Sequence, residues 1–159
     1  MQDISNYQII RKNAYNFYRK IGRIRCPALN NEFVHFNAEG FNHLIYKRKR
    51  SERNKNDQIM KFKLLPKAKH IIEISTTYQE YDESLTEIDR KKFKKKVRET
   101  VIVNYWGFIA IIKNYRVKVI IRQIGNGQKH FWSVMPAWAI SQYRDIKLIS
   151  KAKGDLIED

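Results

Sequence analysis

The sequence contains a single cysteine, Cys26, so no disulfide bond can form within the chain. Proteins without disulfide bonds are typical of reducing compartments, and we expect a cytoplasmic protein. The opening residues lack a basic segment followed by an apolar run, so no signal peptide is expected. The longest apolar stretch, from Val101 to Ile112, is interrupted by Asn104 and is too short to cross a bilayer as a helix. We therefore expect no membrane partner.

Sequence motifs for metal and cofactor chemistry are also missing. There is no His-Glu-x-x-His motif, no cysteine pair and no cluster of carboxylates. Two-metal nucleases need several converging carboxylates, so that class is disfavoured. The segment Gly125-Asn126-Gly127 is typical of a turn and not of a phosphate-binding loop. We expect no metal and no cofactor.

Acidic residues are few, because 16 Asp and Glu stand against 32 Lys and Arg, which gives a formal net charge of +16. Self-repulsion on this scale destabilises a compact chain, and a polyanionic partner relieves it. RNA or another nucleic acid is the partner that this charge favours. An anionic membrane surface, or a basic surface with no polyanion bound, are the other interpretations.

The pattern predicts a single α+β domain over residues 1–159, with N-terminal helices packed on one face of a C-terminal antiparallel sheet of about four strands. The chain divides into four parts: residues 1–75, mainly helical; residues 76–100, a charged loop or insert with a short surface helix; residues 101–136, the antiparallel sheet; and residues 137–159, a tail.

Helical spacing in the first part covers residues 4–21, 38 to about 49, and 57–65, and residues 33–36 form a candidate strand. Asp57 is expected to cap the third helix and Pro66 to interrupt it.

The last two strands should form a hairpin around a type I′ turn at Asn126-Gly127. That turn places Arg122 opposite Phe131 and Ile120 opposite Ser133. One face of the hairpin is then basic and carries an aromatic ring and a hydroxyl: Lys118, Arg122, Lys129, Phe131 and Ser133. The other face is apolar: Val117, Val119, Ile121, Trp132 and Val134. A basic face with an exposed ring can clamp phosphates and stack a base, and it can equally be an ordinary solvated sheet face.

The second helix carries a histidine and a lysine that suit RNA chemistry without a metal. Histidine can move protons near neutral pH, and a nearby cation stabilises the charge of the phosphorane. His43 and Lys47 share one polar helix face, although a lone helical histidine is also common as a plain surface residue.

Three segments resemble a known superfamily: Val34-His-Phe-Asn-Ala-Glu-Gly-Phe-Asn-His43-Leu-Ile-Tyr-Lys47, Gln58-Ile-Met-Lys-Phe-Lys-Leu-Leu-Pro66 and Lys129-His-Phe-Trp-Ser133-Val. The chain here is similar to the small phage and mobile-element nucleases of the barnase–EndoU–colicin–RelE-like (BECR) superfamily, over roughly residues 30–136 apart from 76–100. The resemblance implies a helical part before a four-stranded antiparallel sheet, and metal-independent cleavage of tRNA or other translation RNA. It implies His43 as general acid or base, Lys47 as its basic helper, Arg122 as a cation from a middle strand, and Ser133 as the hydroxyl that orients the phosphate.

We therefore predict a metal-independent, toxin-like endoribonuclease that cleaves by transesterification at the 2′-OH, with a cognate acidic inhibitor protein as a further partner. Further residues are expected to contact the nucleic acid: Arg48, Lys49, Arg50, Lys118, Lys129, His130 and Phe131. The alternative is a non-catalytic nucleic-acid-binding module of a phage or mobile element, which needs only the charge and the exposed rings. A phage structural or packaging accessory protein is a third reading.

Overall fold

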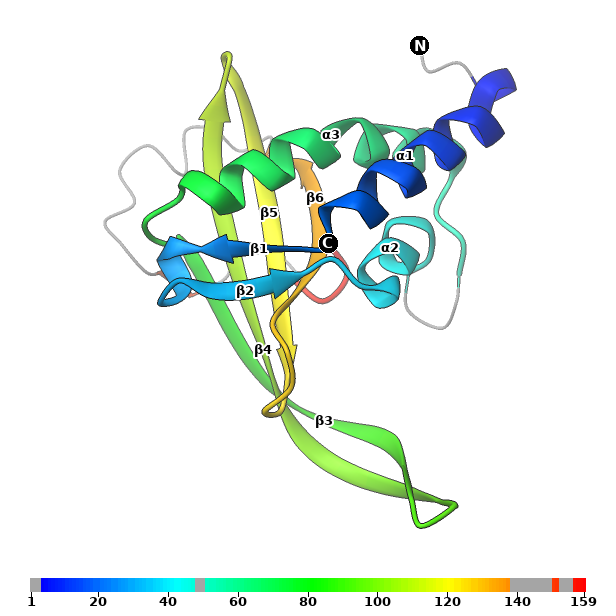
Figure 1. Cartoon of the computed structure of the whole chain (residues 1–159), viewed down its shortest axis with the longest axis vertical. Helices are drawn as coiled ribbons and strands as arrows, with labels where there is room; N and C mark the ends of the chain where they lie inside the picture. The colour runs from blue at the N-terminus through cyan, green and yellow to red at the C-terminus, as the bar shows by residue number, and fades with distance from the viewer. Residues whose placement is uncertain (1–3, 48–50, 138–149, 152–155) are drawn as a thin grey trace.

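The computed structural model describes residues 4–47, 51–137, 150–151 and 156–159 (Figure 1). Its helical elements are η1 (Ile4–Asn6), α1 (Tyr7–Ile21), η2 (Pro27–Leu29), α2 (Ala38–Ile45) and α3 (Lys55–Ile74). Its strands are β1 (Arg23–Cys26), β2 (Glu32–His35), β3 (Glu80–Lys92), β4 (Lys95–Ile112), β5 (Tyr115–Ile124), β6 (His130–Pro136) and β7 (Ser150–Lys151).

The described strands form one mixed sheet in the order β1-β2-β6-β5-β4-β3-β7. The β2–β6 and β3–β7 contacts are parallel, and the other pairs are antiparallel. The α+β class is therefore confirmed, but the prediction of about four strands is wrong. The sheet is larger because β1 and β2 join it from the N-terminal half, and because β3 comes from the segment that was predicted as a loop.

The apolar core lies between the sheet and the helices, which cross one face of it (Figure 1). Helix α1 confirms the helical spacing of residues 4–21, and it buries Tyr7, Ala14 and Tyr18. Aromatic rings from distant elements meet in this core, where Tyr18 lies 5.8 Å from Phe131 between ring centroids. Contacts of this kind hold α1 and α2 against β6.

Helix α3 runs without a break from Lys55 to Ile74, so the predicted interruption at Pro66 is wrong. Proline removes one backbone hydrogen bond from a helix, but Pro66 is exposed, while residues on both sides of it are fully buried. Burial of that apolar stripe outweighs the lost bond. The helix is capped by Asn54, whose side chain accepts a hydrogen bond from the backbone N–H of Asp57 (2.8 Å), so Asp57 is not the cap.

Helix α2 ends at Ile45, four residues earlier than predicted. The chain then turns back, since the N–H of Lys47 donates to the carbonyl of Ser51 (2.7 Å) and the N–H of Arg53 donates to that of Ile45 (2.7 Å). This turn brings Arg53 beside α2 and decides the chemistry of the site described below.

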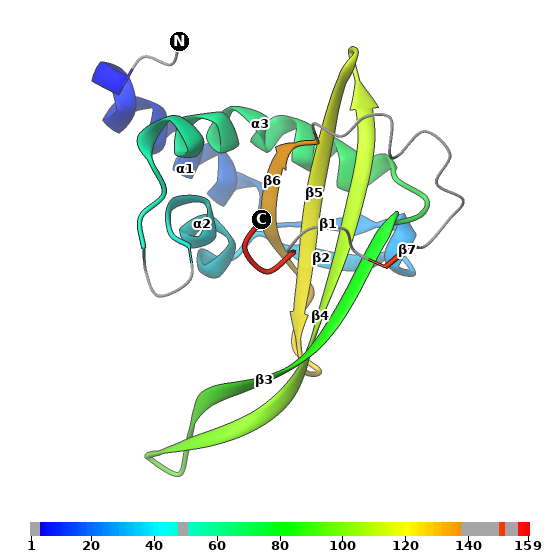
Figure 2. The same cartoon turned by 180° about the vertical axis from the view of Figure 1, so that it is seen from behind.

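Residues 76–100, predicted as a loop with a short surface helix, form most of a long β-hairpin. The whole of β3 pairs with residues 95–107 of β4, around a two-residue turn at Phe93 and Lys94, which both have positive φ (51° and 63°). The far half of this hairpin, which we call the arm (residues 86–101), extends well beyond the rest of the molecule (Figures 1 and 2).

The β5–β6 hairpin has an irregularity that the sequence did not indicate. Far from the turn the predicted register holds, with Ile120 opposite Ser133, but near the turn Arg122 pairs with His130 and not with Phe131. A bulge at Trp132 accounts for the shift, because one residue is left without a cross-strand partner. The type I′ turn is also absent, since positive φ occurs there at Gly125 and not at Asn126 or Gly127.

Residues 156–159 cover part of the sheet face opposite the helices (Figure 2). Leu156 is fully buried there against Val103, Tyr105 and Ile120. The prediction of a solvated basic face on the hairpin is therefore wrong over this region, because a segment distant in sequence packs on it.

Candidate functional site

Helix α2 lies unusually close to β6, and this contact positions His43. Asn37 caps the helix by accepting a hydrogen bond from the N–H of Gly40 (3.1 Å). A Cβ atom at Gly40 would lie 2.2 Å from the carbonyl oxygen of Phe131, so only glycine fits. His43 follows one turn later and faces β6 at the bulge.

A pocket of about 590 Å³ opens beside α2, between this helix and the β5–β6 hairpin. Its lining residues are Glu39, Asn42, His43, Tyr46, Lys47, Arg122 and Trp132. Three of the four predicted catalytic residues, His43, Lys47 and Arg122, thus border one cavity. Ser133 does not.

Trp132 forms one wall of this pocket. The predicted strand alternation placed it on the apolar face of the hairpin, which is wrong. The His43 ring stacks on it with 3.8 Å between centroids and 12° between planes. The guanidinium carbon of Arg122 lies 3.5 Å from the Trp132 centroid. Two groups this close cannot share one face of the indole, so His43 and Arg122 cover opposite faces. The bulge puts Trp132 here, and Phe131 in the core instead.

The imidazole of His43 is buried and faces cations. Its Nε2 lies 3.2 Å from Nη2 of Arg53, and an arginine always donates, so Nε2 is the acceptor. Burial, followed by the charges of Arg53, Lys61 and Arg122, lowers the pKa of His43 to about 2. In this arrangement His43 is neutral at pH 7, and its accepting nitrogen is already occupied.

A second histidine is held in the same manner. Nε of Arg122 donates to Nε2 of His130 (2.9 Å), and its Nη2 donates to Oε2 of Glu39 (2.6 Å). Burial and the charge of Arg122 lower the pKa of His130 to about 4. Glu39 balances the charge of Arg122, so Arg122 is not an isolated cation in the pocket.

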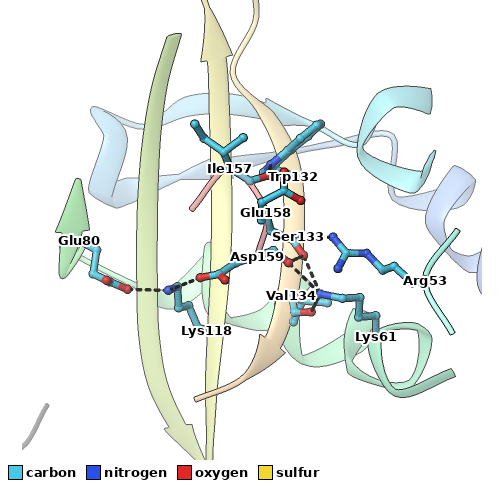
Figure 3. Close-up of polar contacts among 10 residues, drawn as sticks. All are labelled: Arg53, Lys61, Glu80, Lys118, Trp132, Ser133, Val134, Ile157, Glu158 and Asp159. Carbon is cyan, nitrogen blue, oxygen red and sulfur yellow. Dashed lines mark hydrogen bonds and ion pairs between the residues drawn. The ribbon is translucent and has the colours of Figure 1, made fainter. Parts of the chain in front are cut away.

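The predicted residues Ser133 and Lys118 lie under residues 156–159 (Figure 3). Oγ of Ser133 donates to the backbone oxygen of Asp159 (2.7 Å). Nζ of Lys118 lies between Glu80 (3.1 Å) and the carboxylate of Asp159 (2.9 Å). Burial by itself lowers the pKa of Lys118, but Asp159 and Glu80 together outweigh it and raise the pKa.

Two cations in this region were not singled out from the sequence. Lys61 is 4% exposed, and its Nζ donates to Oγ of Ser133 (3.0 Å), to the carbonyl of Val134 (3.2 Å) and to the backbone oxygen of Asp159 (2.9 Å). Arg53 is 6% exposed. A signal for Lys61 existed, because it shares the helical spacing of the buried residues Gln58, Phe62 and Leu65.

The remaining predicted contacts do not meet at the pocket. Phe131 is fully buried and stacks on Phe36 in the core (5.0 Å, 10°), so the prediction that it contacts nucleic acid is wrong. Lys129 pairs with Glu32 of β2. The predicted basic residues Arg48, Lys49 and Arg50 lie outside the residues that the structure describes.

Comparisons with protein-family models, curated proteins and solved structures found no match for this chain. Among its described helices, none combines the length and the apolar character needed to cross a membrane. The resemblance to the nuclease superfamily stays a prediction, and the function has to be argued from this chain's own geometry.

Proposed function

We propose that this protein binds nucleic acid and that the arm makes its principal contact with the phosphate backbone. The observation that supports this most directly is the sequence at the far end of the arm, Arg90-Lys-Lys-Phe-Lys-Lys-Lys-Val-Arg98, which has seven cations and no acid. Phe93 lies at the tip and is 97% exposed. Phosphates neutralise such a cluster, and an exposed ring can stack on a base.

The arrangement within the arm supports a polyanionic partner. Lys91 and Lys96 stand directly opposite each other in the β3–β4 register, and like charges in that position are destabilising. Arg98, closer to the body, has Glu87 and Asp89 within 3.8 Å, whereas the described side chains beyond it form no ion pair. The charge at the tip is therefore unbalanced within the described part of the molecule, and a phosphate backbone supplies what it lacks.

The turn between β3 and β4 also supports contact with a partner. Phe93 and Lys94 occupy the left-handed region that glycine and asparagine favour in such turns. A bulky residue there costs on the order of 1 kcal/mol in backbone strain. A ring held at the tip despite this cost is consistent with contact to a partner.

The test is nucleic-acid binding over a series of salt concentrations, measured by fluorescence anisotropy with tRNA, single-stranded RNA and duplex DNA. The variant K94Q/K95Q/K96Q removes three exposed charges from the arm. The matched control K12Q/K20Q/K113Q removes three exposed charges elsewhere. We expect the arm variant to reduce the slope of log K against log salt by about 2 to 3, and the control to change it less. Equal loss in both variants, or no binding by the native chain, would refute the proposal.

A second candidate is the metal-independent endoribonuclease of the sequence prediction, because His43, Lys47 and Arg122 border one pocket. For His43 to accept a proton, Arg53 must first leave its Nε2. The assay is incubation with tRNA and total RNA in EDTA, with His43→Ala compared against His70→Ala, an exposed histidine on α3. We expect cleavage by the native chain and by His70→Ala only. Intact RNA with the native chain, or equal cleavage by His43→Ala, would eliminate this candidate.

A further inference from the structure

The pocket beside α2 is one of three hollows that adjoin one another. A second hollow, of about 320 Å³, lies between α1 and α2 and is lined by Gln8, Arg11, Lys12, Tyr15, Phe41 and Asn42. Asn42 also lines the first pocket, so the two hollows meet at this residue. Each of them has a volume that is ordinary for the binding site of a small ligand.

A third hollow, of about 370 Å³, joins the first pocket to the arm. It shares Glu39 with that pocket and is bordered on its other side by Ile88 and Asp89 of the arm. Helix α2 lies between α1 and the arm (Figure 1). The three hollows therefore form one continuous groove, which we call the α2 groove, from α1 across α2 to the base of the arm.

Two exposed tyrosine rings border the α2 groove. Tyr46 is 38% exposed at the first pocket, and Tyr15 is 44% exposed at the second hollow. Tyr15 is held in place by Phe41, with 5.1 Å between ring centroids and 66° between planes. Packing of the core does not account for rings that stay this open, whereas stacking on a planar ligand does. All nucleobases are such ligands, because each of them has a π-face.

The cations of the α2 groove lie beside these rings. Lys47 borders the pocket of Tyr46, and Arg11 and Lys12 border the hollow of Tyr15. Within the part of the chain that the structure describes, Lys12 and Lys47 form no ion pair. Rings and cations that alternate along a groove match the alternation of bases and phosphates along a nucleic-acid strand.

The two acidic residues of the α2 groove do not cancel this charge. Glu39 is paired with Arg122 (2.6 Å), and Asp89 lies 3.8 Å from Arg98. The lysines of the groove are thus left to attract a polyanion.

An exposed amide stands at the point where the first two hollows meet. The side chain of Asn42 faces solvent there, and an amide can both donate to and accept from the edge of a base. Such an edge is free on an unpaired base, but the partner strand occupies it in a duplex.

We propose that the α2 groove binds a single strand of nucleic acid, with bases stacked on Tyr46 and Tyr15 and phosphates beside Lys47 and Lys12. This inference rests on the proposed function and names the form of nucleic acid that the body of the protein takes. A duplex keeps its bases stacked on one another, so it cannot use these rings and contacts only the arm. The native chain therefore binds a single strand more tightly than a duplex at equal salt.

The experiment is fluorescence anisotropy with a labelled single-stranded RNA and with the RNA duplex of the same sequence. The variants are Tyr46→Ala and Tyr15→Ala. Tyr115→Ala is the matched control, because Tyr115 is 36% exposed on β5 and does not line the α2 groove. We expect each groove variant to bind the single strand about tenfold more weakly and the duplex as the native chain does. The control should bind both forms as the native chain does.

Two further measurements separate stacking from a general loss of structure. Tyr46→Phe and Tyr15→Phe keep the ring and should retain the affinity for the single strand. A single-stranded RNA with one 2-aminopurine between uridines reports stacking directly, since its fluorescence falls when the base lies on a ring. The fall should occur with the native chain and with Tyr115→Ala, and it should be smaller with Tyr46→Ala.

The outcomes distinguish this inference from the proposed function. Single-strand affinity that is unchanged in both Tyr46→Ala and Tyr15→Ala, or an equal loss in Tyr115→Ala, would overturn the inference. The proposed function would stand in that case if K94Q/K95Q/K96Q still weakened the binding of both forms. Absence of binding of either form by the native chain would refute both.

Discussion

Because of Lys61, the free energy of unfolding of the protein should rise between neutral and alkaline pH. Its pKa falls from 10.5 to about 7 in the folded chain, because burial and Arg53 disfavour the charged form. At 1.36 kcal/mol for each unit, this fall corresponds to about 5 kcal/mol of unfavourable free energy in the charged folded state. That cost is fully present below pH 7, where Lys61 is protonated in both states, and it disappears as the pH rises toward 10.5, where the unfolded chain also loses the proton.

The variant Lys61→Met removes the titrating group and keeps an apolar chain of similar length. The free energy of unfolding of the native chain, minus that of Lys61→Met, should therefore increase with pH. Integration of the proton difference predicts a rise of about 2 kcal/mol between pH 7 and pH 9, and almost no change below pH 6.

Urea unfolding followed by circular dichroism at several pH values measures this difference directly. The hydrogen bonds that the methionine removes shift the difference by a constant, so they do not imitate the pH dependence. Lys67→Met, which removes a less buried lysine from the same helix, is the matched control. A flat difference for Lys61→Met between pH 7 and 9 would mean that burial and Arg53 do not lower the pKa of Lys61 in the folded chain, and this reasoning would be refuted.

Three other measurements test the packing around the site. Burial keeps His43 neutral in the folded chain, while the unfolded chain protonates it below about pH 6.5, so the free energy of unfolding should fall as the pH drops. In urea unfolding between pH 6 and 4, His43→Gln should reduce the slope of this free energy against pH by about 1.4 kcal/mol per pH unit. An unchanged slope would contradict the burial of this ring. Gly40→Ala should destabilise the folded chain by about 3 kcal/mol or more, because the added Cβ meets the carbonyl oxygen of Phe131. The control Asn42→Ala on the same helix should cost under about 0.5 kcal/mol. Equal melting temperatures for the two variants would show that α2 lies further from β6. Phe131→Ala should cost about 3 to 5 kcal/mol and Trp132→Ala clearly less, as seen in thermal melts, and the reverse order would place the bulge elsewhere.

Local patterns were enough to predict much of the fold. Helix α1 and strand β5 follow from periodicities of 3.6 and 2, which depend only on neighbouring residues. The same local reasoning failed at Pro66, where packing of the helix on both sides of the proline outweighs a broken hydrogen bond. It failed again for residues 76–100, because charge predicted a loop, while pairing between β3 and β4 makes most of this segment a β-hairpin.

The candidate site was predicted only in part. His43 and Lys47 share a helix face, so spacing alone placed them together, and the hairpin brought Arg122 to the same side. A single bulge at Trp132 places Phe131 in the core and Trp132 at the pocket, the reverse of the predicted arrangement. No residue near it signals a bulge. Ser133 kept its predicted register but lies beneath a segment that the sequence indicated only as a tail.

By itself the sequence determined the α+β class, the charge of +16 and its concentration in residues 90–98, since these depend on composition and short-range order. Only the tertiary structure decided that Lys61 lies against Ser133, 72 positions away, and against Asp159, 98 positions away. The physical reason is that a charge becomes costly, and therefore informative, only when folding removes it from water. Which charges are buried depends on contacts between distant segments, and no local pattern specifies them.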